Sequence, residues 1–130
     1  MFIFEVYFAV LGNYNILIVD DCDLLCLGLK RMISAPNLNI SVVKNGNDAL
    51  SALRSSNFHS VFLDVNLPDI NGIEVLKELK RMSPHTKVVV MTANTTEDYR
   101  QKALEGGAFH FIGKPFEAGE IHSVIQNILS

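Results

Sequence analysis

The 130-residue sequence is poor in cysteine and proline, with two and four residues respectively. Cys22 and Cys26 lie four residues apart, which matches neither a CxxC redox motif nor the spacing of zinc ligands. The histidines are scattered without ligand-like spacing, at positions 59, 85, 110 and 122. The sequence therefore predicts no zinc site, and the two cysteines fit a reduced, intracellular setting best.

An excess of positive charge is also lacking. Eleven basic and fourteen acidic residues are interspersed, the net charge is −3, and no basic stripe runs along the chain. We therefore expect no direct contact with nucleic acid. The composition, 48% hydrophobic and 19% charged, is typical of one compact soluble domain and excludes a disordered or fibrous chain.

No apolar run approaches the roughly 20 residues that a membrane-spanning helix needs. The stretch Met1–Leu11 is nearly all apolar, but it is too short and has neither a basic start nor a small-residue cleavage site. We expect no contact with a membrane. Residues 1–13 are interpreted as an apolar N-terminal extension, either an extra packed strand or a frayed end, ahead of a domain at 14–130.

Five short hydrophobic runs predict strands. Three are continuously apolar, which is typical of strands covered on both faces in the middle of a parallel sheet. The other two include polar residues and are typical of flanking strands. In chain order the predicted strands span 16–19, 40–43, 61–63, 88–91 and 108–112.

Apolar residues at helical spacing fall between and after these runs. The predicted helices lie around 25–33, 49–53, 72–82, 96–105 and 121–129. Strands and helices thus alternate five times with short connections, and right-handed crossovers turn this order into helices on both faces of one sheet. The predicted fold class is α/β: a doubly wound five-stranded parallel sheet in a flavodoxin-like (βα)5 three-layer sandwich.

Polar residues stand at the carboxyl ends of the predicted central and last strands. Asp20 and Asp21 follow NILIV, and Asp64 follows SVFL. Thr92 follows VVVM, and Lys114 follows FHFIG. Because ligands of such sheets bind at this edge, we expect these five side chains to converge there.

Three converging carboxylates would repel one another, and a hard divalent cation removes that conflict. Magnesium suits this set, because it prefers oxygen ligands and usually takes few carboxylates. Lys114 adds a compact positive charge for a phosphoryl oxygen, and the Thr92 hydroxyl adds a donor. Together they indicate phosphoryl transfer to a carboxylate nucleophile.

The chain resembles a known family, the receiver domain of two-component response regulators. The resemblance runs from about residue 14 to 130. Four motifs carry it: ILIVDD, FLDVNLPDINGIEVL, VVVMTA and AFHFIGKPF. It implies a cytoplasmic signalling domain that takes a phosphoryl group from a sensor histidine kinase or a histidine phosphotransfer protein. It also implies a downstream protein or output domain as partner, and no enzymatic activity beyond self-phosphorylation and slow dephosphorylation.

The resemblance assigns the acceptor and the metal ligands. Asp64 would be the phosphoacceptor. Asp21, the Asp64 side chain and the Asn66 backbone carbonyl would hold Mg²⁺, and Asp20 would support the metal through water. These roles follow from the family alone.

The resemblance also implies a switch. Thr92 and Lys114 would grip the phosphoryl group, and Phe111 would be the aromatic residue that turns inward with the threonine. Phe111 lacks the hydroxyl of a tyrosine at that position, and it could also be a simple core residue.

The resemblance also implies that the Lys114–Pro115 bond is cis. Receivers that dimerise through paired charges usually carry an acidic run in the fifth strand and an arginine in the fifth helix. This chain has His110 in that strand and Glu120 and His122 in that helix, so this dimer mode stays open.

Two other functions share part of this pattern. A haloacid-dehalogenase-type aspartyl-phosphate phosphatase also uses a strand-end aspartate, threonine, lysine and magnesium. It needs a second aspartate as general acid two residues after the nucleophile, where this chain has Asn66. A degenerate receiver acting only in binding would lack the acceptor or the lysine, and neither Asp64 nor Lys114 is lost. We expect no output domain within these residues, and whether one follows in a longer protein stays open.

The helix predicted over 96–105 is the least anchored. Only Tyr99, Ala103 and Leu104 have side chains suited to pack inward. We therefore predict that this helix is of low local stability and moves when Asp64 is phosphorylated.

Overall fold

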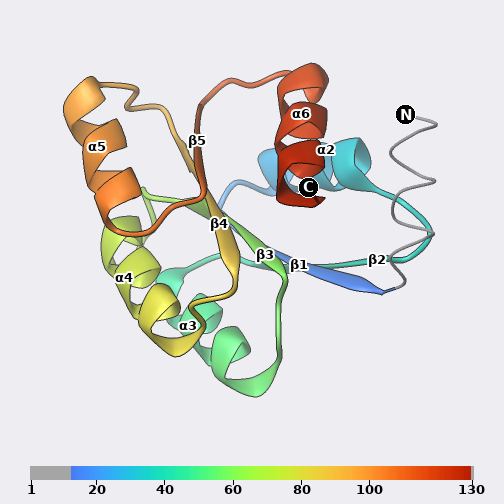
Figure 1. The fold of residues 1–130 in the computed structure, drawn as a ribbon, viewed down its shortest axis with the longest axis horizontal. Coiled ribbons are helices and arrows are strands. Elements are labelled where there is room, and N and C mark those ends of the chain that lie inside the picture. Colours follow the sequence, from blue (N-terminus) through green and yellow to red (C-terminus); the bar gives the residue numbers. More distant parts are fainter. Residues whose placement is uncertain (1–12, 130) are drawn as a thin grey trace.

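The computed structural model describes residues 13–129, which form five strands and five helices (Figure 1). In chain order they are β1 (Tyr14–Val19), α2 (Asp23–Ile33), β2 (Leu38–Val43), α3 (Gly46–Ser55), β3 (Ser60–Asp64), α4 (Gly72–Met82), β4 (Lys87–Thr92), α5 (Glu97–Glu105), β5 (His110–Gly113) and α6 (Ala118–Leu129). The expected extension at 1–13 lies outside the described residues, except for Asn13.

The strands form one parallel sheet in the order β2-β1-β3-β4-β5. The chain winds outward from β1 to β2 on one side and then through β3, β4 and β5 on the other. β1 and β3 are the strands between which the direction of winding changes. This confirms the predicted α/β, doubly wound, five-stranded sandwich, and it puts the carboxyl ends of β1 and β3 side by side.

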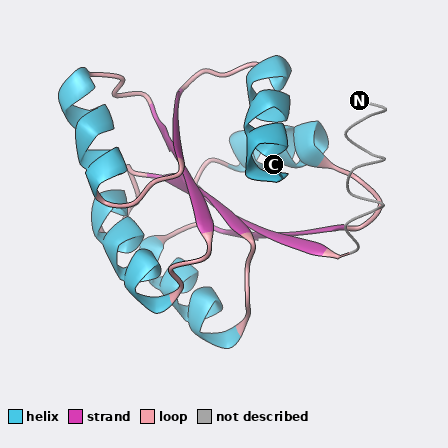
Figure 2. Cartoon of the chain, in the orientation of Figure 1, coloured by secondary structure: helices cyan, strands magenta, loops and turns pink. Residues whose placement is uncertain are grey.

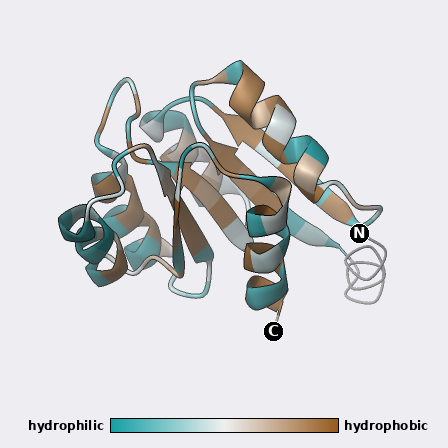
Figure 3. Cartoon of the chain, turned by 90° about the horizontal axis from the view of Figure 1, so that it is seen from above, coloured by the Kyte–Doolittle hydropathy of each residue, from teal (hydrophilic) through white to brown (hydrophobic). Residues whose placement is uncertain are grey.

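Helices cover both faces of the sheet (Figures 1 and 2). Helices α2 and α6 pack on one face and enclose the alternate side chains Ile16, Ile18, Phe62, Val89 and Met91. Helices α3, α4 and α5 pack on the other face. All five residues of β3 are buried, which explains why its central residues 61–63 are apolar without alternation. Figure 3 shows the resulting pattern, with hydrophobic strands inside and hydrophilic helix surfaces outside.

Some predicted boundaries were wrong. The first strand begins at Tyr14, because Tyr14 and Asn15 pair in register with Leu38 and Asn39 of β2. The last strand begins at His110 and not at residue 108, since the Ala108 N–H donates to the Ala103 carbonyl and closes the end of α5.

Two further expectations concern the backbone and the membrane. The Lys114–Pro115 peptide bond is cis, as predicted. Among the described residues, no helix combines the length and the apolar character that crossing a membrane requires.

Candidate functional site

Three aspartates meet at the carboxyl edge of the sheet. Asp20 follows β1 directly and Asp64 is the last residue of β3, so the two neighbouring strands deliver them to one place. One carboxylate oxygen from each of Asp20, Asp21 and Asp64 lies within 4.8 Å of the other two. Asp20 is fully buried, Asp64 is 3% exposed, and Asp21 is exposed. The predicted convergence of the three carboxylates is therefore present.

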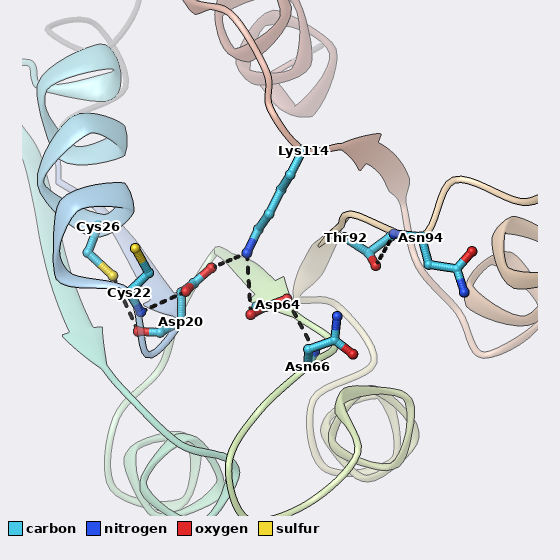
Figure 4. Close-up of polar contacts among 8 residues, drawn as sticks. All are labelled: Asp20, Cys22, Cys26, Asp64, Asn66, Thr92, Asn94 and Lys114. Carbon is cyan, nitrogen blue, oxygen red and sulfur yellow. Dashed lines mark hydrogen bonds and ion pairs between the residues drawn. The ribbon is translucent and has the colours of Figure 1, made fainter.

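Lys114 neutralises part of this charge. Its Nζ lies 2.7 Å from Oδ2 of Asp20 and 3.3 Å from Oδ2 of Asp64 (Figure 4). The Lys114 N–H donates to the Thr92 carbonyl at 2.8 Å, which fixes the start of the loop after β5 against the end of β4. Partial burial alone lowers the pKa of the Lys114 ammonium, but its bonds to the two aspartates outweigh burial and raise that pKa. The lysine is thus held charged beside Asp64.

Asp64 is in a less favourable position for a charge. Burial raises the pKa of its carboxyl, and the neighbouring charge of Asp20 adds to the rise. The Asn66 N–H, which donates to Asp64 Oδ1 at 3.2 Å, and the Lys114 ammonium act in the opposite direction. The free site therefore holds more negative charge than its own cation offsets, and an added cation would relieve it.

Thr92 is fully buried at the end of β4, on the other side of Asp64 from Asp20 (Figure 4). Its Oγ1 accepts the Asn94 N–H at 2.9 Å. The hydroxyl hydrogen of Thr92 can therefore donate to another group, such as a phosphoryl oxygen. Asn94 itself was not predicted. Its Oδ1 accepts from the Thr96 N–H at 3.2 Å and the Thr96 hydroxyl at 2.9 Å, so it organises the loop before α5.

Asn66 and Phe111 are placed in different parts of the fold: Asn66 is in the loop after β3, and Phe111 is in β5. Asn66 is exposed, and its backbone is tied to Asp64 by the hydrogen bond described above. Phe111 is half-buried on the face of α3, α4 and α5, packed against the core cluster that contains Val90 and Ala103. Its role as a switch stays a prediction.

Both cysteines form hydrogen bonds with Asp20. The Cys22 N–H donates to Asp20 Oδ1 at 2.9 Å, and the Cys26 thiol donates to the Asp20 carbonyl at 3.4 Å. Burial, followed by the charge of Asp20, raises the pKa of the Cys26 thiol to about 11. Cys26 is thus a protonated packing residue. The sequence signal that could have found these contacts is their place in the first turn after the Asp20–Asp21 pair.

The donor set fits magnesium. Clustered carboxylate oxygens are the ligands that Mg²⁺ prefers, and the described residues offer no nitrogen or sulfur ligand within the same cluster. Burial, and after it the neighbouring charge of Asp20, raises the pKa of the Asp64 carboxyl, and a bound cation would act against both.

Comparison with known proteins agrees with this geometry. The sequence profile of the response regulator receiver domain matches residues 16–126. The transcriptional regulatory protein ZraR of Salmonella typhimurium is 29% identical over 119 residues, which cover 92% of this chain and 27% of ZraR. The DNA-binding transcriptional regulator NtrC of Proteus hauseri is 30% identical over 116 residues, or 89% of this chain and 24% of NtrC. The chain spans about a quarter of the length of these relatives.

Solved structures share the fold. The BeF3-activated receiver domain of DrrB superposes with a TM-score of 0.83 at 26% identity, covering 90% of this chain and 97% of DrrB's. The chemotaxis response regulator CheY4 of Vibrio cholerae also has a TM-score of 0.83, at 21% identity over 90% of this chain and 99% of CheY4. None of these matches supports the haloacid-dehalogenase-type alternative. The chain belongs to the response regulator receiver domains of two-component systems.

Proposed function

We propose that Asp64 accepts a phosphoryl group from a phosphohistidine on a sensor histidine kinase or histidine phosphotransfer protein. The receiver unit at 14–130 then changes its protein-binding surface. The observation that carries this proposal is the position of Asp64 at the end of β3, with Asp20, Asp21 and Lys114 around it. The reaction needs a carboxylate nucleophile, a cation site and a fixed positive charge in one place, and these residues supply all three.

In the proposed transfer, an Asp64 carboxylate oxygen forms a bond to phosphorus while the bond from phosphorus to the donor imidazole nitrogen breaks. The nitrogen keeps the electron pair and takes up a proton. Lys114 is 3.3 Å from Asp64 and would move its charge to a phosphoryl oxygen, and the Thr92 hydroxyl would donate to another. Asp21, Asp64 and the Asn66 carbonyl would hold magnesium, with Asp20 acting through water. Bound magnesium would offset the negative charge shared by carboxylates and phosphoryl group.

An apolar groove beside the site supports a protein as the donor. It lies between α2 and the segment after β5, has a volume of about 290 Å³, and borders Lys114 itself. Leu24 and Phe116 both line it, and Leu24 is 81% exposed. A small-molecule donor would have no use for an apolar surface next to the lysine, whereas a donor helix would cover it. We place this exchange in the cytoplasm.

The response to phosphorylation would be carried by α5 and β5. Pulling the Thr92 hydroxyl toward the phosphoryl group would rearrange the loop that Asn94 organises and make room for Phe111 to turn inward. The changed surface would bind a downstream protein or an output domain. Because the sequence has no basic stripe, we assign no contact with nucleic acid to this domain. It would catalyse only its own phosphorylation and slow dephosphorylation.

The test is treatment of the full chain with acetyl phosphate and magnesium, followed by intact mass measurement. Wild type should gain one phosphoryl group, and chelation of the magnesium should abolish the gain. Asp64→Asn should gain none. Asp48→Asn makes the same chemical change at an exposed position in the first turn of α3 and should behave as wild type. A phosphoryl adduct on Asp64→Asn at the wild-type level would refute the proposal.

A further inference from the structure

The loop between β3 and α4, residues 65–71, is closed at its base. The Gly72 N–H donates to the Val65 carbonyl at 2.9 Å, and Asn66 and Asn71 form an antiparallel bridge across the loop. The closure is tight, because a Cβ on Gly72 would lie 2.3 Å from Val65 Cα. The two ends of the loop are therefore held together right after Asp64.

The tip of the same loop is bound to α3. One oxygen of the exposed Asp69 carboxylate accepts the Gly46 N–H at 2.8 Å, and the other accepts the Asn47 N–H, also at 2.8 Å. These N–H groups open α3 and have no partner within the helix. The next one, of Asp48, donates to the Asn45 side chain. All three opening N–H groups are thus satisfied, two of them by a residue 22 or more positions later in the chain.

Packing strengthens this attachment. Ile70 lies so close to Gly46 that a Cβ there would be 2.3 Å from Ile70 Cγ1. Loss of water alone raises the pKa of the Asp69 carboxyl, but the N–H groups of Asn47, Gly46 and Ile70 outweigh it and hold that pKa below its usual range. Asp69 is therefore charged at neutral pH, which suits the positive end of a helix dipole.

The tip and the base are joined by a short, stiff link. Only Leu67 and Pro68 separate Asn66 from Asp69. Leu67 packs against the core cluster of α3, α4 and α5, and the proline ring fixes its own φ. At the base, the Asn66 N–H donates to Asp64 Oδ1 at 3.2 Å. Asp69 and the Asn66 N–H that contacts the Asp64 carboxylate therefore lie three residues apart on one constrained segment.

We propose that Asp69 is a positioning residue: by anchoring the loop to the start of α3, it holds the Asn66 backbone against Asp64. The proposal rests on the proposed function, in which Asp64 and the Asn66 carbonyl bind magnesium. Asp69 lies outside the cluster of carboxylates that would bind the metal, so it acts through Asn66. Without the anchor, the Asn66 backbone would sample other positions, and the site would bind magnesium more weakly.

The experiment compares Asp69→Ala, Asp69→Asn and the control Asp48→Ala in the full chain. Asp48→Ala removes the same charge from the start of the same helix and leaves the loop anchor intact. Magnesium affinity is measured by NMR titration, from the signals of residues 19–22 and 64–67. Second-sphere changes at metal sites commonly reduce affinity about 10-fold or more. We expect a loss of about tenfold in Asp69→Ala and less than about twofold in Asp48→Ala. Asp69→Asn should be intermediate, because its amide keeps one acceptor oxygen.

The outcomes separate the two proposals. If wild type shows magnesium shifts, and Asp69→Ala and Asp48→Ala lose magnesium affinity equally, the loss comes from the removed charge. That result would overturn the positioning role and leave the proposed function untouched. Unchanged affinity in both Asp69 variants would overturn the positioning role as well. Absence of magnesium shifts near Asp64 in wild type would overturn the proposed function, and the positioning role with it. If Asp69→Ala does not fold, Asp69→Asn against Asp48→Asn decides by the same criterion.

Discussion

Helices α4 and α5 lie side by side on the same face of the sheet, yet they are attached to it very differently (Figure 1). Both are short, with 11 and 9 residues, and both begin with a capping side chain. In α4 the buried residues are Gly72, Ile73, Val75, Leu76 and Leu79. In α5 the buried residue is Ala103. Similar local structure therefore comes with very unequal burial.

The rest of α5 is held by weak interactions. Its ion pairs, Arg100 with Glu97 at 3.6 Å and Lys102 with Asp98 at 3.4 Å, join exposed side chains. Exposed pairs at this spacing contribute only about 0.3–0.5 kcal/mol each. Most helical stability in proteins comes from packing of an apolar face, and α5 has little of one. We conclude that α4 belongs to the stable core of the domain and that α5 is the element able to shift at low cost.

The difference between α4 and α5 should be largest in the free energy of unfolding when one leucine of each helix is truncated to alanine. Leu79 of α4 is fully buried, and Leu104 of α5 is 36% exposed. We expect Leu79→Ala to lower the free energy of unfolding by roughly 2–5 kcal/mol, because it leaves a cavity in the core. Leu104→Ala should change it by no more than about 0.5 kcal/mol. Urea unfolding followed by circular dichroism measures both, and equal losses would show that α5 is as firmly packed as α4.

A second comparison uses amide hydrogen exchange with and without beryllofluoride, a mimic of the phosphoryl group. Binding of the mimic at Asp64 should change the amide exchange rates most over residues 92–107 and around Phe111. The expected change is about tenfold, which corresponds to about 1.4 kcal/mol. The α4 amides should change little. Thr92→Ala should bind the mimic but lose the change, because the hydroxyl that links site and loop is gone. A response centred on α2 and α3 would mean that the output surface has been misplaced.

The sequence predicted the fold and most of the site because both depend on local patterns. Continuous apolar runs identified buried strands, and Asp64 and Lys114 could be found because parallel strands bring their carboxyl ends to one edge. The spacing of apolar residues also indicates which face of a helix packs inward, but the orientation of the helix is set by the elements packed against it. Leu104 was predicted to pack inward, whereas it is 36% exposed.

Contacts between segments distant in the chain were out of reach. The anchor formed by Asp69 was not predicted, since nothing in its own segment shows that it meets the start of α3. Tyr14 and Asn15, the polar residues that begin β1, were not predicted. They belong to the strand because they pair with β2, and not because of their hydrophobicity.

The smallest expected effect concerns the helix caps, and it tests whether α5 unfolds separately. The Asn71 side chain accepts the Ile73 N–H at 2.8 Å at the start of α4, and Thr96 Oγ1 accepts the Tyr99 N–H at 3.4 Å at the start of α5. Removing a cap typically costs about 1 kcal/mol of helix stability. Because α4 is part of the core, Asn71→Ala should lower the free energy of global unfolding by about that amount. Thr96→Ala should leave the free energy of global unfolding within roughly 0.3 kcal/mol of wild type, since α5 opens before the core does. The loss should instead appear as faster amide exchange within α5.

Urea unfolding and amide exchange, both measured on the two variants, test this prediction. Equal losses of global stability would mean that α5 unfolds together with α4, and the low-cost motion proposed for signalling would then have no basis.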